Sequence, residues 1–221
     1  MTTILLARHG ESDWNRAKRW QGFADRPLTE LGREQAVALA ERLADTELDA
    51  VYSSDLQRAR DTAEIVARSK GLRVETTPDL REVDVGSWSG LIRAEAEARF
   101  PDAYARWLQG GEGWDDGETY EEMSRRVVAA IARVAAQHPN GRVLVVAHGG
   151  SIRAAHAAAL GLDVHTYRRI QRVEPNATLS AVYVDGGRLS ELCRTEDLDD
   201  FLRAEQQRRR KAALRPPTPA A

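Results

Sequence analysis

Apolar residues in this chain gather in four short runs, and between the runs apolar positions recur every three or four residues. Short apolar runs bounded by polar residues are typical of strands buried on both faces, whereas the wider spacing is typical of amphipathic helices. The alternation of the two patterns predicts a mixed α/β fold with a mostly parallel sheet. The predicted strands span residues 4–7, 50–52, 143–147 and 179–184.

Four longer stretches have helical spacing and recognisable ends. Thr29 is placed to cap the first of these helices, and Gly71 follows the end of the second. Thr119 and Glu122 have the spacing of a capping box ahead of an apolar stripe, which predicts the start of the third. The predicted helices span residues 29–43, 56–69, 119–134 and 150–160.

The remaining segments complete the predicted architecture. Asp185, Gly186 and Gly187 separate two apolar runs and predict a hairpin, so an antiparallel strand should lie near one edge of the sheet. Residues 91–117 combine short helical pieces with aromatics and glycines, and we expect them to cover the strand ends. We therefore predict a three-layer α/β/α sandwich in one domain, residues 1–200. Residues 201–221 form a basic, proline-rich tail that we expect to be partly disordered.

Size and charge narrow the classes of function. At 221 residues the chain is long enough for one α/β domain with a core of its own. Its 32 Lys and Arg nearly balance 34 Asp and Glu, so no overall field favours nucleic acid as a partner. The one cysteine, Cys193, excludes an internal disulfide framework and favours a cytoplasmic location. Because no run approaches the ~20 apolar residues of a membrane span, we expect no membrane partner.

Two histidines directly follow predicted strands. Arg8 and His9 leave the first strand, His148 leaves the third, and Arg58 lies one helical turn after the second. The carboxyl ends of parallel strands share the edge at which open α/β sheets bind ligands, so these side chains should meet. The helix after His148 would add free backbone N–H groups, with Gly149 at its start. Guanidinium groups bind phosphate and imidazole can act as a nucleophile, so this group is suited to phosphoryl transfer.

Four separated motifs carry this chemistry. They are Arg8-His9-Gly10-Glu11-Ser12, Ser54-x-x-x-Arg58-Ala59-x-x-Thr62-Ala63, Leu80-Arg81-Glu82 with Gly86 and Trp88, and Ala147-His148-Gly149-Gly150. In content and order they closely resemble the motifs of the histidine phosphatase superfamily, the phosphoglycerate mutase-like proteins. The resemblance runs from about Thr3 to about Val184.

The resemblance implies a role for each catalytic residue. His9 would be the nucleophile that becomes phosphohistidine, while Arg8, Arg58 and His148 would surround the transferred phosphoryl group. Glu82 resembles the family's proton donor, which protonates the leaving oxygen and later takes a proton from water. The alternative for each histidine alone is a buried ring bonded to backbone, and for Glu82 a surface carboxylate. The occurrence of all five together favours the catalytic roles.

The resemblance also implies further phosphate contacts and a reaction without metal. Asn15, Gln21 and Gly22 fall where similar proteins contact the phosphate, and the helix start at Gly149 adds backbone donors. The positive charge would come from arginines and helix ends, so we expect no metal and no cofactor. Trp114 could pack in the cover or line the substrate mouth, and the sequence leaves this open.

Three functions compete: a phosphomonoesterase, a cofactor-dependent phosphoglycerate mutase and a non-catalytic phosphate-binding module. A pure binder needs neither a nucleophile nor a proton donor. The stretch from Glu82 to His148 is short, whereas the mutases it resembles have a longer insertion with paired arginines. Arg93 and Arg99 are the nearest candidates here for a substrate clamp, but they are not adjacent. We therefore favour a phosphatase acting on a small phosphorylated metabolite, and a homodimer is compatible with the sequence.

Overall fold

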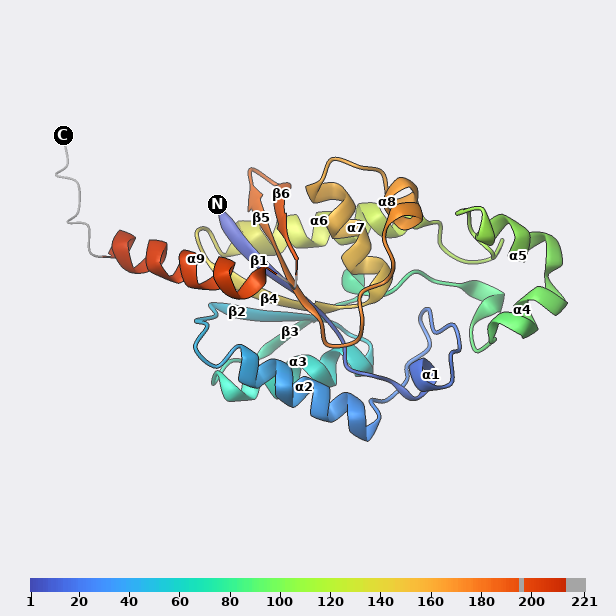
Figure 1. Cartoon of the computed structure of the whole chain (residues 1–221), viewed down its shortest axis with the longest axis horizontal. Coiled ribbons are helices and arrows are strands. Elements are labelled where there is room, and N and C mark those ends of the chain that lie inside the picture. The colour runs from blue at the N-terminus through green and yellow to red at the C-terminus, as the bar shows by residue number, and fades with distance from the viewer. Residues whose placement is uncertain (195–196, 214–221) are drawn as a thin grey trace.

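A six-stranded sheet forms the centre of the computed structural model, which describes residues 1–194 and 197–213 (Figure 1). The strand order is β3-β2-β4-β1-β5-β6. The first four strands are parallel, and β5 is antiparallel to both of its neighbours. This arrangement confirms the predicted sheet, with its antiparallel hairpin at one edge. The strands are β1 Thr2–Arg8, β2 Ala50–Ser54, β3 Val74–Thr77, β4 Arg142–Ala147, β5 Leu179–Asp185 and β6 Arg188–Cys193.

Helices cover both faces of this sheet and complete the predicted three layers. The α2 and α3 helices lie against one face, and α6, α7 and α8 lie against the other (Figure 1). The α9 helix packs on the α2–α3 side through Leu198 and Leu202. These helices span α2 Glu30–Arg42, α3 Gln57–Ser69, α6 Tyr120–Gln137, α7 Gly149–Ala159, α8 Val164–Ile170 and α9 Leu198–Ala213.

Side chains of the central strands alternate between two hydrophobic cores. Ile4 and Leu6 of β1 belong to the core under α6 and α7, while Leu5 and Ala7 belong to the core under α2 and α3. Successive strand residues point to opposite faces, and here both faces are covered. This is why the strand is apolar at every position. Full burial of each Leu or Ile side chain contributes roughly 1.5–3 kcal/mol to folding.

Two of the predicted helix starts, at Thr29 and Thr119, are confirmed by their caps. The Thr29 hydroxyl accepts a hydrogen bond from the Gly32 N–H, 3.0 Å away. Thr119 and Glu122 form the reciprocal capping box, in which each side chain accepts from the other residue's backbone N–H. Such caps stabilise a helix by about 0.5–2 kcal/mol each and define where it begins.

Three features of the fold were not predicted. The β3 strand has one apolar residue, Val74, and pairs only with β2 at the sheet edge, so no apolar run marks it. The α8 helix begins at its cap, Asp163, in a stretch without a strong apolar stripe. The α1 helix, Asp13–Arg16, is a single turn held by a capping box between Ser12 and Asn15.

The domain boundary expected at residue 200 falls inside α9. Leu198, Leu202 and Glu205 face the body of the protein, where Glu205 pairs with Arg142 of β4. In the sequence, the acidic and basic residues between these three conceal their helical spacing. Residues 214–221, which include the proline-rich end of the expected tail, lie outside the described residues. In the described part of the chain, the helices include none with the length and apolar character to cross a membrane.

The segment expected to cover the strand ends folds into α4, Arg93–Arg99, and α5, Pro101–Leu108, which project from one end of the sandwich (Figure 1). Short 3₁₀ turns at Pro78–Leu80 and Gly86–Trp88 precede it. Aromatic rings hold the cover in place. Trp88 is fully buried and packs against Trp20, Trp107 and Trp114, with ring centroids 4.8–6.3 Å apart.

Candidate active site

The two strand-end histidines meet because their strands are neighbours. Arg8 of β1 is in register with Ala147 of β4, and the His9 N–H donates to the Ala147 carbonyl at 3.1 Å. His148 follows Ala147 directly. The imidazole rings of His9 and His148 therefore lie edge to face, with centroids 5.1 Å apart.

The His9 ring is held in one tautomer. Its Nδ1 lies 2.6 Å from the carbonyl oxygen of Gly10, and a carbonyl oxygen can only accept, so Nδ1 carries the proton. Burial, together with Arg58 and Arg8, holds the pKa of His9 well below its ordinary value. The ring is therefore neutral near pH 7, and Nε2 keeps its lone pair. A neutral imidazole with a free Nε2 is a competent nucleophile.

His148 is completely buried beside it. Among the described residues, neither of its ring nitrogens has a hydrogen-bond partner. Burial, together with the nearby charge of Arg58, holds the pKa of His148 well below its ordinary value. Leaving a buried polar group unpaired costs about 1–3 kcal/mol, and such groups concentrate at functional sites. The neutral ring can donate one hydrogen bond to an anion.

Arg8 and Arg58 are anchored without carboxylates. Arg58 donates to the carbonyls of Ala24 at 2.7 Å and Gly22 at 3.0 Å, and Arg8 donates to the Glu174 carbonyl. Within the described chain, the Nε of each has no partner. Burial lowers the pKa of Arg58 to about 10 and also lowers that of Arg8, so both stay charged at neutral pH. Carbonyl anchors fix the guanidinium planes and leave their charge for a phosphoryl group.

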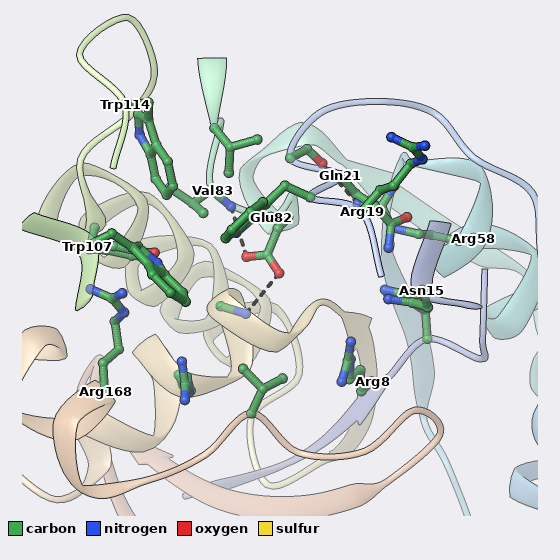
Figure 2. A pocket seen from close by; sticks show the side chains of 18 residues that line it. Arg8, Asn15, Arg19, Gln21, Arg58, Glu82, Val83, Trp107, Trp114 and Arg168 are labelled. Carbon is green, nitrogen blue, oxygen red and sulfur yellow. Dashed lines mark hydrogen bonds between the residues drawn. The ribbon is translucent and has the colours of Figure 1, made fainter. Parts of the chain in front are cut away.

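Glu82 is held at the start of α7. Its Oε2 accepts from the Gly150 N–H and its Oε1 from the Val83 N–H, both at 3.0 Å. A Cβ on Gly150 would lie 2.0 Å from Oε1, so only glycine permits this approach. Figure 2 shows the carboxylate in the middle of the pocket, with Arg8, Arg58 and Asn15 on one side and Trp107 and Arg168 on the other.

The other residues predicted to contact phosphate do not all line the cavity. Asn15 and Gln21 line the cavity, and the side-chain oxygen of each accepts a hydrogen bond from Ser12, which leaves their amide N–H groups for a ligand. Gly22 has φ +50 and faces Val85 so closely that a Cβ would not fit. Gly149 is buried: a Cβ there would lie 2.5 Å from Val173 Cγ1. Gly150, rather than Gly149, lines the cavity.

Apart from the buried His148 and Gly149, these predicted site residues line one cavity of about 220 Å³. Trp114 both packs and lines it: the indole is buried and donates to the Glu118 carbonyl at 2.8 Å, and the ring faces the cavity. The lining consists of Arg8, His9, Asn15, Arg19, Trp20, Gln21, Gly22, Arg58, Glu82, Val83, Val85, Trp107, Trp114, Tyr120, Gly150, Arg153, Arg168 and Val173.

Three of these arginines, Arg19, Arg153 and Arg168, were not predicted from the sequence, which favoured Arg93 and Arg99 instead. Arg153 lies one turn after Gly150 on α7, a spacing that was available in the sequence, whereas Arg168 lies on the unpredicted α8. Arg93 packs over the Trp107 ring instead, 5.5 Å from its centroid. In the described part of the chain, the cavity lining includes neither Arg93 nor Arg99.

Comparison with known proteins gives consistent matches. Residues 4–196 match the model of the histidine phosphatase superfamily (branch 1). The metal-independent phosphoserine phosphatase of Arabidopsis thaliana is 42% identical over 159 residues, which cover 70% of this chain and 67% of that protein. Glucosyl-3-phosphoglycerate phosphatase of Mycobacterium tuberculosis is 38% identical over 171 residues, 73% of this chain and 76% of that protein. The solved structure of Bacillus stearothermophilus YhfR superposes with a TM-score of 0.81 at 31% identity, covering 88% of this chain and 96% of that one.

Proposed function

The chain belongs to the histidine phosphatase superfamily (branch 1) and is a phosphatase, and we propose that it hydrolyses phosphate monoesters of small metabolites through a phosphohistidine on His9. One observation carries the proposal. The neutral His9 ring, its Nδ1 bonded to the Gly10 carbonyl, lies beside the buried Arg58 and the half-buried Arg8, and neither guanidinium group has a carboxylate partner among the described residues.

In the first step, His9 Nε2 attacks the phosphorus and the bond from phosphorus to the leaving oxygen breaks. Arg8, Arg58 and the His148 ring face the equatorial oxygens, where negative charge spreads in the transition state. Each charged hydrogen bond there contributes on the order of 1.5–3 kcal/mol. The Glu82 carboxyl donates its proton to the leaving oxygen, because an alkoxide is a poor leaving group.

In the second step, water attacks the phosphohistidine. The water oxygen bonds to phosphorus while the Glu82 carboxylate takes a proton from that water. The P–N bond breaks, and phosphate is released. The Gly10 carbonyl accepts from His9 Nδ1 throughout, so the ring returns to the same tautomer. Arginines and backbone donors supply the positive charge, and the scheme needs no metal.

The relatives support a small substrate. Two of them are named as a phosphoserine phosphatase and a glucosyl-3-phosphoglycerate phosphatase, and a cavity of about 220 Å³ accommodates molecules of modest size. The single cysteine supports a cytoplasmic location for such an enzyme.

The test is the covalent intermediate. His9→Ala should fold normally and lose at least ~10³-fold in turnover, because no neighbouring group can replace the nucleophile. A phosphorylated substrate should label the native protein at His9 with an acid-labile, base-stable phosphate. His138→Ala, at a histidine outside the cavity lining, is the matched control and should keep its activity. Retained turnover in His9→Ala would refute this mechanism.

The mutase alternative has its own readout. With 3-phosphoglycerate and a bisphosphoglycerate primer, a mutase would equilibrate the positional isomers. We expect free phosphate instead, since water reaches the phosphohistidine before an acceptor hydroxyl is held in place. Isomer exchange without net phosphate release would favour the mutase.

A further inference from the structure

The geometry points to a second anion subsite, formed by Arg153 and Arg168, that selects substrates with another negatively charged group near the ester oxygen. This inference rests on the proposed phosphatase function and specifies its substrate class. The two arginines come from different helices, α7 and α8, and both line the cavity that contains His9 and Glu82.

Arg153 borders the phosphate-binding part of the cavity. It lies three residues after Gly150 on α7, so both residues are on the same face of the helix. Its Nη2 donates to the Gln171 carbonyl at 2.5 Å, while its buried Nε has no partner among the described residues. Its charge reaches the catalytic groups, since it contributes to lowering the pKa of Arg8.

Arg168 is held in a similar way. Its guanidinium lies over the Tyr120 ring, 3.3 Å from the centroid, and its Nη1 donates to the Gly110 carbonyl at 2.9 Å. Within the described chain, its buried Nε also lacks a partner. Burial lowers the pKa of both Arg153 and Arg168, and the charge of Arg168 lowers the pKa of Arg153 further. Two cations kept close together in a cavity favour an anion between them.

The cavity lining carries more positive than negative charge. Five arginines line it, of which Arg19 pairs with Glu95 at 3.1 Å. Among the described lining residues, Glu82 is the one carboxylate facing the other four. A phosphate monoester carries at most two negative charges, so positive charge remains whether or not Glu82 is ionised. A second anionic group on the substrate would reduce this excess.

The layout of the cavity specifies where that group lies. Figure 2 shows Glu82 between Arg58 and Asn15 on one side and Arg168 on the other. With the phosphoryl group at Arg8 and Arg58, the leaving oxygen lies at Glu82, and the rest of the substrate extends toward Arg153 and Arg168. The second anion therefore follows the ester oxygen after a short chain. Phosphorylated hydroxy acids and amino acids have a carboxylate at this position, and short bisphosphates have a second phosphate.

Three substrates with one carbon skeleton test the subsite. They are sn-glycerol 3-phosphate, with a terminal hydroxymethyl group, 3-phosphoglycerate, with a carboxylate, and glycerol 1,3-bisphosphate, with a second phosphate. We expect kcat/KM to be on the order of 10–100-fold higher for at least one of the two compounds with a second anionic group, 3-phosphoglycerate and glycerol 1,3-bisphosphate, than for sn-glycerol 3-phosphate. Comparison of 3-phosphoglycerate with glycerol 1,3-bisphosphate identifies whether the subsite prefers a carboxylate or a phosphate. p-Nitrophenyl phosphate reports on the phosphatase chemistry alone.

Arg168→Gln should remove most of that preference, mainly through KM, while hydrolysis of p-nitrophenyl phosphate stays within about 3-fold of wild type. Arg153→Gln should lower kcat/KM more for the preferred compound than for p-nitrophenyl phosphate. Arg168→Lys should restore part of the preference, because it keeps the charge. Arg169→Gln, at the exposed neighbour on α8, is the matched control and should change neither readout.

The two proposals fail in different ways. A wild-type protein that releases phosphate from none of the compounds contradicts the proposed function. A wild-type protein that hydrolyses p-nitrophenyl phosphate but shows no preference for either anionic compound overturns the subsite alone. The subsite is also overturned if Arg153→Gln and Arg168→Gln lower kcat/KM equally for all four compounds.

Discussion

At the scale of single residues, the site is defined by side chains that backbone carbonyl and N–H groups hold in place. Gly10 holds the His9 tautomer, Gly22 and Ala24 hold Arg58, and the Gly150 N–H holds Glu82. A carbonyl fixes the position of a cation without neutralising its charge. The charge remains available to the transition state, where preorganised electrostatics act most strongly.

Glu82→Gln should separate proton donation from positioning. Gln keeps an oxygen that can accept from the Gly150 N–H but cannot give a proton to the leaving group. We expect a loss of about 10²–10⁴-fold on alkyl phosphates and a much smaller loss on aryl phosphates, whose phenolate leaves without protonation. Steady-state kinetics on one ester of each type measure the difference. Equal losses on both would assign Glu82 to positioning alone.

At the scale of elements, α7 connects the catalytic groups to the pair formed by Arg153 and Arg168. Its start carries Gly150 against Glu82, its next turn carries Arg153, and its buried face carries His156 against β5 and α8. A change in the position of α7 would therefore move several parts of the site together.

Gly150→Ala tests the close approach between α7 and Glu82. The added Cβ would lie 2.0 Å from Glu82 Oε1, so the carboxylate must move away from the leaving oxygen. We expect at least ~10-fold lower kcat on an alkyl phosphate, since small displacements of catalytic groups have large effects on rate. Gly111→Ala, in the cover, brings its Cβ no closer than 3.4 Å to Arg106 and serves as the control. Unchanged kcat in Gly150→Ala would show that the carboxylate position is not critical.

His156 gives α7 a pH-dependent contribution to stability. It is buried, its Nε2 lies 2.8 Å from the Ser180 hydroxyl, and burial lowers its pKa to about 4. The unfolded chain, with a histidine pKa near 6.5, binds more protons in this range. The free energy of unfolding therefore falls as pH decreases from about 6.5 to about 4, with about 3 kcal/mol attributable to His156.

Urea unfolding of wild type and His156→Gln at pH 7 and pH 4.5 measures this contribution. The variant should lose less stability on acidification than wild type, because its side chain does not titrate. Other groups titrate equally in both proteins, so the comparison isolates His156. The same loss in the two proteins would contradict the assignment.

At the scale of the whole molecule, α9 is anchored to the sheet by a buried ion pair. Arg142 Nη2 lies 2.7 Å from Glu205 Oε2, and Glu205 also accepts from the Thr3 hydroxyl. The Arg142 side chain is 1% exposed and that of Glu205 is 10% exposed, so neither charge has water as a substitute partner. The helix that follows residue 197 is thus part of the same folded unit.

Glu205→Gln should lower the free energy of unfolding by about 3–5 kcal/mol, because the buried Arg142 charge would lose its partner. Arg203→Gln, which removes an exposed ion pair with Asp200 on the same helix, should change it by no more than about 0.5 kcal/mol. Urea unfolding curves of the two variants give the comparison. A similar small effect in both would show that α9 is not anchored through this pair.

The sequence by itself determined the features that depend on local pattern. Apolar runs determined the central strands, capping residues determined the helix starts, and strand-end positions brought His9 and His148 together, since neighbouring parallel strands end at one edge. The β3 strand and α8 escaped prediction because an edge strand and a short helix need little apolar sequence.

Only the tertiary structure decided the features that depend on packing between distant segments. The His9 tautomer follows from the position of one carbonyl, and the meeting of Arg153 with Arg168 follows from how α8 packs beside α7. Gly150 lines the cavity and Gly149 does not, and this depends on how α7 is oriented about its own axis. Periodicity specifies which face of an element is buried, but not which side chains of two elements share a cavity, because that depends on their relative position in space.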